Sequence, residues 1–127
     1  MLFRFLTSCT VVALVACNSA PSSQPSAENA AHCVAAFNYA GYWYAQGNRD
    51  ERGIIEMKAR SFFEMDDLTK SGRIEIAKHE SSELTKQYGK DRQVMSRLLA
   101  DCITKQNGRA DFLAERDRLW QRASSPV

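Results

Sequence analysis

The chain has 127 residues, with 17 Lys and Arg against 15 Asp and Glu, and its formal net charge is +2. This near-neutral balance gives no electrostatic footprint for nucleic acid, so we expect no nucleic-acid partner. The hydrophobic and aromatic contents, 44% and 9%, are ordinary for a globular domain and exclude a wholly disordered chain.

The first 16 residues have the pattern of a cleaved secretory signal. One charged side chain, Arg4, precedes an apolar stretch at residues 5–16. That stretch is shorter than the roughly 20 apolar residues of a membrane-spanning helix, and polar residues follow it closely. Residues 1–16 are therefore predicted to be removed, which takes away one basic residue (17 − 1 = 16) and none of the 15 acidic ones.

The signal ends in Leu14-Val15-Ala16-Cys17, which resembles the lipobox of bacterial lipoprotein precursors. The resemblance implies cleavage before Cys17, a diacylglycerol on its sulfur and usually a further acyl chain, such as palmitate, on its amino group. Two or three acyl chains anchor a protein stably in a membrane. Asn18 at the next position favours the outer over the inner membrane. The alternative is cleavage at an ordinary site nearby, which gives a secreted protein without lipid.

Residues 17–29 are predicted to be the lipidated N-terminus and a flexible linker. Residues 18–29 contain two prolines, four serines and no large apolar side chain. The linker places the following domain, residues 30–123, on the periplasmic side of the membrane, and residues 124–127 form a short tail. About 100 residues suffice for one small core and not for two domains.

The domain is predicted to be all-α, because apolar residues recur at helical spacing and no segment alternates with the period of a strand. Short loops make successive helices antiparallel, so the fold is a small bundle of four to five antiparallel helices. The expected helices cover residues 30–46, a segment from 48 or 50 to about 70, residues 73–88, a segment from 91 to about 106, and residues 110–122.

The first predicted helix is apolar on every side, since no charge occurs between His32 and Arg49. Such a helix is either the central helix of the bundle or a core helix whose back face meets a partner. Its surplus aromatic residues, Tyr39, Tyr42 and Trp43, are the candidate partner-binding residues. Tyr and Trp are frequent among the residues that dominate protein interfaces.

Two cysteines remain in the domain once Cys9 leaves with the signal and Cys17 carries lipid. Cys33 and Cys102 form an even pair in an oxidising compartment. In an antiparallel bundle, the start of the first helix lies level with the end of the fourth, and both cysteines fall on predicted core faces. We therefore expect a Cys33–Cys102 disulfide; the alternative is two free buried thiols.

The last predicted helix mixes apolar and charged residues. Its expected core face consists of Phe112, Leu113, Leu119 and Trp120. Arginines at 109, 116, 118 and 122 alternate with acidic residues at helical spacing, which is typical of a solvated face.

No pattern in the chain predicts a metal site, a cofactor or a catalytic residue. Residues 67–75 resemble part of a calcium-binding EF-hand loop, but Lys78 occupies the position of the bidentate Glu. His32 and His79 have no second ligand at helical spacing, and no serine lies on a nucleophile turn.

Two hypotheses for function remain. The first is a non-enzymatic binding or accessory protein that engages another envelope protein, as secretion-system accessories and immunity proteins do. The alternative is a small envelope hydrolase that uses carboxylates on a helix, for example Glu80 and Glu83. A pair of acids converging on a cleft would favour the enzyme, whereas an exposed patch at Tyr39 and Trp43 would favour binding.

Overall fold

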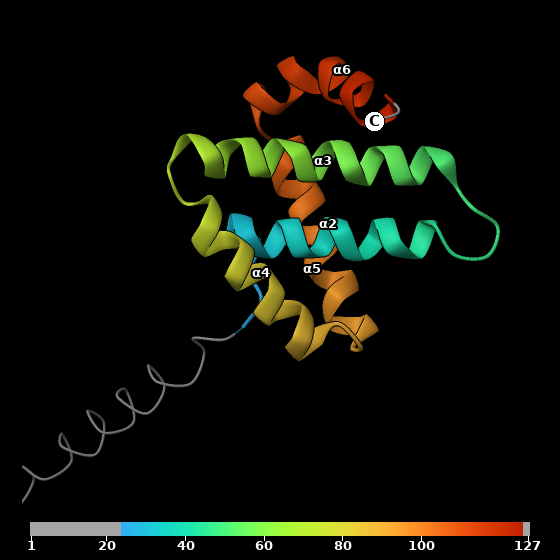
Figure 1. Cartoon of the computed structure of the whole chain (residues 1–127), viewed down its shortest axis with the longest axis vertical. Helices are drawn as coiled ribbons and strands as arrows, with labels where there is room; N and C mark the ends of the chain where they lie inside the picture. Colours follow the sequence, from blue (N-terminus) through green and yellow to red (C-terminus); the bar gives the residue numbers. More distant parts are fainter. Residues whose placement is uncertain (1–23, 126–127) are drawn as a thin grey trace, which may run out of the picture.

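The computed structural model describes residues 24–125, which form five α-helices (Figure 1). The prediction of an all-α helical domain is confirmed. None of these helices is long and apolar enough to cross a membrane. The predicted signal, the lipobox and Cys17 lie outside the described residues. The helices are α2 (Ala30–Tyr44), α3 (Glu51–Lys70), α4 (Ile74–Tyr88), α5 (Arg92–Asn107) and α6 (Ala110–Ser124).

Side-chain caps determine where three of the helices begin. The side chain of Asn29 accepts a hydrogen bond from the backbone N–H of the first turn of α2. Asp50 and Asp91 do the same for α3 and α5, which satisfies backbone donors that have no partner within the helix. Of the two predicted starts for the second helix, Asp50 is therefore the correct one. Gly47 follows α2 in the left-handed conformation, with φ +58°, and α2 ends at Tyr44 instead of residue 46.

The helices are arranged around α2. α2 and α3 run antiparallel as a hairpin, and α6 covers the side of α3 that faces away from α2 (Figure 1). α4 and α5 pack against α2, and α5 crosses the hairpin on its way from α4 to α6 (Figure 1). The hydrophobic core is correspondingly divided, with one cluster around Phe37 and Met95 and another around Phe63 and Phe112.

Both interpretations of the first helix apply, each to a different part of α2. From Ala31 to Phe37 the helix is buried on nearly every side; Ala36 and Phe37 are 0% exposed. Its last turn emerges from the core, where Tyr42 is 61% exposed and Trp43 44%. α2 is thus the central helix at its start and a surface helix at its end.

The predicted disulfide is present and joins α2 to α5. Cys33 and Cys102 are bonded, with their Cα atoms 5.6 Å apart and 69 positions apart in the sequence. Both side chains are buried in the cluster that contains Phe37. Closing a loop of this length contributes on the order of 4 kcal/mol in the chain-entropy model, which is comparable with the total stability of many small domains.

Candidate partner-binding surface

Three aromatic side chains lie together at the C-terminal end of α2. The ring of Trp43 meets Tyr39 and Tyr42 edge to face, with centroid distances of 6.1 Å and 6.0 Å. Tyr39 is half-buried, whereas Tyr42 and Trp43 are exposed. The structure therefore brings together the three residues that the sequence singled out, and we call them the aromatic patch. Large exposed aromatic side chains in one patch are typical of interaction sites.

A groove lies beside the aromatic patch, between α2 and α4. Its volume is about 350 Å³, and most of the surface it exposes is apolar. Two of its lining residues are small. Ala35 on α2 is buried, and Gly89, directly after α4, has no side chain. The lining residues are Ala35, Asn38, Tyr39, Tyr42, Trp43, Ser81, Thr85 and Gly89.

A cation is held at the edge of the patch. The guanidinium of Arg92, the first residue of α5, lies 4.7 Å from the centre of the Trp43 ring. A cation over the face of an indole is attracted by the negative potential of the ring. Among residues 24–125, neither Arg92 nor its neighbour Lys90 forms an ion pair. The patch thus combines aromatic surface with positive charge.

The end of α2 that carries the patch is fixed to α3. The backbone N–H of Asp50 donates to the carbonyl of Tyr44 at 2.9 Å, across the loop between the helices. The ring of Tyr44 packs against Gly53, which is buried and leaves room for the ring because it has no side chain. Trp43 therefore projects from a well-supported turn.

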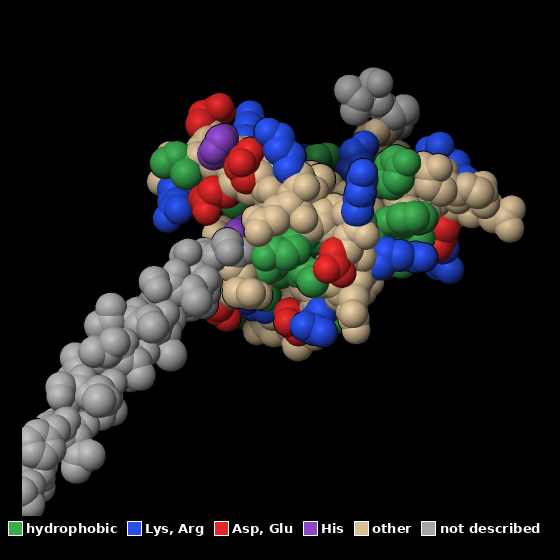
Figure 2. Space-filling model, turned by 90° about the horizontal axis from the view of Figure 1, so that it is seen from below, with side chains coloured by type: hydrophobic (Ala, Val, Ile, Leu, Met, Phe, Trp, Pro, Cys, Tyr) green, Lys and Arg blue, Asp and Glu red, His purple; other side chains and the backbone are tan. Residues whose placement is uncertain are grey.

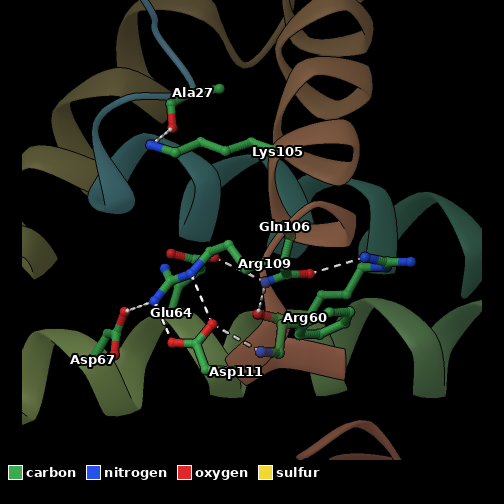
Figure 3. Close-up of polar contacts among 9 residues, drawn as sticks. Ala27, Arg60, Glu64, Asp67, Lys105, Gln106, Arg109 and Asp111 are labelled. Carbon is green, nitrogen blue, oxygen red and sulfur yellow. Dashed lines mark hydrogen bonds and ion pairs between the residues drawn. The ribbon is translucent and has the colours of Figure 1, made fainter. Parts of the chain in front are cut away.

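A second feature, which the sequence analysis missed, is a buried polar network between α3 and α5 (Figure 3). The Gln106 amide donates to Glu64 Oε2 at 2.8 Å and to the Arg60 carbonyl at 3.1 Å. Arg60 Nη1 donates to Gln106 Oε1 at 2.9 Å, and its guanidinium carbon lies 5.3 Å from the Phe112 ring centre. Burial raises the pKa of the Glu64 carboxyl, although the bond from Gln106 opposes this shift.

Every buried polar side-chain atom of this network has a hydrogen-bond partner, so we interpret the network as a structural contact between helices and not as a binding site. No buried side-chain nitrogen or oxygen within residues 24–125 lacks a hydrogen-bond partner. Polar groups that are all bonded to one another hold helices in one arrangement and leave no group aimed at a ligand. The sequence signal for the network, Arg60 and Glu64 at helical spacing, is the same as for a pair on a solvated face.

Two of the arginines predicted for a solvated face contact α3. Arg109, which directly precedes α6, is partly buried, whereas Arg122 is exposed as predicted. Arg109 lies 3.0 Å from Asp67 of α3, with its guanidinium 4.8 Å from the Phe63 ring centre. Arg122 pairs with Asp66 of α3 at 2.9 Å and lies over Phe62. These arginines attach α6 to α3. Conversely, the expected core residue Leu113 is 52% exposed.

The residues directly before α2 contact the helical domain, although the sequence assigns them to the linker. Lys105 Nζ donates to the Ala27 carbonyl at 3.1 Å (Figure 3). It also lies 3.2 Å from the carboxylate of Glu28. His32 Nδ1 accepts a hydrogen bond from the Ser26 backbone N–H at 3.1 Å. The chain is thus fastened to the domain from about residue 26 onwards.

The carboxylates proposed for a hydrolase each have their own partner. Glu80 accepts a hydrogen bond from Asn29 at 3.1 Å and lies 3.9 Å from Arg73. Glu83 pairs with Lys86 at 3.1 Å. Glu80 lines a hollow of about 850 Å³ between the first turns of α2 and the end of α3, but Glu83 does not, so the two carboxylates do not converge on one cleft.

The EF-hand-like segment, residues 67–75, forms the end of α3, the turn that follows it and the first residues of α4. Asp67, at the first ligand position, pairs with Arg109, and Gly72 adopts a left-handed conformation with φ +73°. Within the described part of the chain, no group of three His, Cys, Asp or Glu side chains converges as a metal site.

Comparisons with known proteins give no relative for this chain. No family model matches it, and no curated protein and no solved structure does so either. A function is therefore inferred from its own residues.

Proposed function

We propose that this protein is a lipid-anchored helical protein of the bacterial envelope, held on the periplasmic side of the outer membrane, which binds another envelope protein and catalyses no reaction. The observation that carries the binding role is the exposed aromatic patch of Tyr39, Tyr42 and Trp43 beside an apolar groove. The lipobox at residues 14–17 supports the anchor.

The disulfide is consistent with this location. Disulfides persist in oxidising compartments such as the periplasm and are rare in reducing ones. The Cys33–Cys102 bond joins two helices that are far apart in the sequence. An oxidising compartment would preserve this bond and so stabilise the folded state.

The position of the patch suits an anchored binding protein. The chain enters the domain at the start of α2, and the patch lies at the opposite end of that helix (Figure 1). The helix has 15 residues, and at 1.5 Å per residue it spans about 22 Å. A partner bound at the patch would therefore contact the part of α2 that lies furthest from the anchored end of the chain.

A capture experiment with matched variants tests the proposal. The full-length lipidated protein is used as bait in the bacterial envelope, and the captured protein is identified and quantified for the original chain and for Trp43→Ala. We expect capture to fall by about tenfold or more, because truncated interface hot spots cost roughly 2 kcal/mol or more. Ile76→Ala, which removes a 60% exposed side chain from α4, is the control and should leave capture unchanged.

Thermal melting of each variant separates binding from folding. Trp43 is exposed and lies outside the buried clusters, so its truncation should leave the Tm nearly unchanged. A collapsed transition in Trp43→Ala would show that the residue belongs to the core, where such a truncation costs about 3–5 kcal/mol. Equal capture by all three proteins would reject the patch as a binding site.

A further inference from the structure

The surface that we propose for partner binding has a defined chemical character. We infer that it recognises an acidic segment of the partner protein, which places apolar side chains in the groove between α2 and α4 and a carboxylate against Arg92. This inference depends on the proposed function and specifies the partner that the surface fits.

The first support is the state of Arg92. Its guanidinium is stacked on the Trp43 ring at 4.7 Å. Within residues 24–125 it has neither an ion pair nor a side-chain hydrogen bond. A stacked guanidinium keeps its N–H groups pointing sideways, where they can bind both oxygens of one carboxylate. Because the ring already restricts the side chain, little further rotamer entropy is lost when a carboxylate binds.

The second support is the balance of charge beside the groove. Lys90 and Arg92 flank Asp91, whose carboxylate accepts the backbone N–H of Val94 as the cap of α5. The nearby acid of α4, Glu83, is paired with Lys86. Within residues 83–92 the basic side chains number three and the acidic ones two. Lys90 and Arg92 are the two cations of this segment without an ion pair, and Arg92 lies over Trp43 of the patch. Lys90 and Arg92 therefore attract a negatively charged partner.

The third support is the shape of the surface. A second hollow of about 250 Å³ continues along α4 and shares Asn38 and Ser81 with the groove beside Trp43. Together the two hollows follow α4 from Ile74 to Gly89, which is long enough for several residues of a peptide. The second hollow is lined by Val34, Asn38, Met65, Leu68, Ile74, Ala77, Lys78, Ser81 and Ser82.

A concave site of this kind fits a protein segment better than a membrane surface. Anionic lipids also attract aromatic and basic side chains, but they meet surfaces that project into the headgroups. In the view of Figure 2, hydrophobic side chains lie next to Lys and Arg toward the end of the molecule where the α2–α3 loop protrudes. Apolar side chains on successive turns of a segment can enter the two hollows while its carboxylate remains at the rim.

Site-specific photo-crosslinking tests the inference. Tyr42, which is 61% exposed at the mouth of the groove, is replaced by p-benzoylphenylalanine in the full-length protein in its native envelope. The cross-linked product is digested and sequenced by mass spectrometry. We expect a partner peptide that is negatively charged, with Asp or Glu close to the cross-linked residue.

Charge variants provide the second measurement. Arg92→Glu should lower the cross-linking yield by about tenfold or more, because it places a carboxylate against the acidic segment. Arg92→Lys keeps the charge but loses the planar stacked donors, and its yield should be intermediate. Arg97→Glu makes the same charge change at an exposed position on another side of α5, and its yield should equal that of the original protein.

The results distinguish the proposed binding role from the narrower inference that the bound segment is acidic. A cross-link to a neutral or basic protein segment, or equal yields for Arg92→Glu and Arg97→Glu, overturns the acidic-segment inference and leaves the binding role standing. A cross-link to lipid, or to a second copy of this chain, overturns the inference and identifies the surface as a membrane or self-association site. No cross-link to any molecule overturns the proposed function as well.

Discussion

The ring of Tyr44 lies against Gly53 so closely that a Cβ on residue 53 would come within 2.6 Å of two ring carbons. This contact connects the last turn of α2 to the first turn of α3. It also supports the residue next to Tyr44, the exposed Trp43 of the aromatic patch.

We predict that Gly53→Ala destabilises the protein only while Tyr44 is present. The added methyl group overpacks the contact, which costs about 1–3 kcal/mol. In a Tyr44→Ala background the methyl group has room, and alanine is about 1 kcal/mol better than glycine inside a helix. Urea unfolding of the four proteins in this double-mutant cycle measures the coupling. An equal loss of stability in both backgrounds would show that the Tyr44 ring does not restrict position 53.

Removal of the disulfide is expected to cost much of the domain's stability. Cys102→Ala should lower the free energy of unfolding by about 2–5 kcal/mol, because the Cys33–Cys102 bond closes a long loop. Cys33→Ala should have a similar effect, and the double variant should be little worse than either one, since both single changes already break the same bond. Two freely alkylated thiols in protein taken from the native envelope would contradict this prediction.

The buried carboxyl of Glu64 makes a pH-dependent contribution to stability. Because burial raises its pKa above that of the unfolded chain, the folded state holds the proton more tightly. The contribution of this group to the free energy of unfolding is fully present below the pKa of the unfolded chain, about 4.3. It is lost as the pH rises through the raised pKa of the folded state. Glu64→Gln keeps the shape without this titration. The free energy of unfolding of Glu64→Gln should therefore increase relative to that of the original protein as the pH rises.

Urea unfolding of both proteins at several pH values from about 4 upward measures that difference. The other titrating groups are common to both proteins and cancel in the comparison. Asp117→Asn removes an exposed carboxyl of α6 and is the matched control for the loss of one acidic side chain. A difference for Glu64→Gln that is constant with pH, or that moves against the variant, would contradict a raised pKa for Glu64.

The anchor is tested at Cys17, which precedes the described residues. Cys17→Ser should abolish labelling by a radioactive or clickable fatty acid and move the protein from the membrane fraction to the soluble one, because at least two acyl chains are needed for stable attachment. Asn18→Asp is the companion variant, and it should keep the lipid and shift the protein toward the inner membrane. Unchanged membrane association of Cys17→Ser would reject the lipoprotein assignment.

The helices and the disulfide could be predicted because their signals are local or follow from simple topology. Asp91 caps its helix, and Gly47 and Gly72 adopt the left-handed conformations that end helical segments. To predict the pairing of Cys33 with Cys102, it was enough that the start of the first helix lies level with the end of the fourth helix in the bundle.

The polar contacts between helices could not be predicted in this way. Arg60 and Glu64 on α3 have the spacing of an ordinary surface pair, and only the packing of Gln106 from α5 and Phe112 from α6 makes them interior residues. The ion pairs of Arg109 with Asp67 and of Arg122 with Asp66 likewise become evident only once α6 is packed against α3. The exposure of Trp43 likewise depends on how the other helices pack around α2, which residue patterns within α2 do not encode.

The network around Gln106 restricts how this chain can change over evolution. Losing Gln106 would leave the buried Glu64 carboxyl without its hydrogen-bond donor, and losing Arg60 would leave Gln106 Oε1 without one, at about 1–3 kcal/mol for each orphaned group. Replacing all of them together by apolar residues of similar volume can be neutral. Positions 60, 64 and 106 should therefore covary in any descendant of this sequence. A chain that keeps Gln106 but has an apolar residue at position 64 would have to pack α5 on α3 differently.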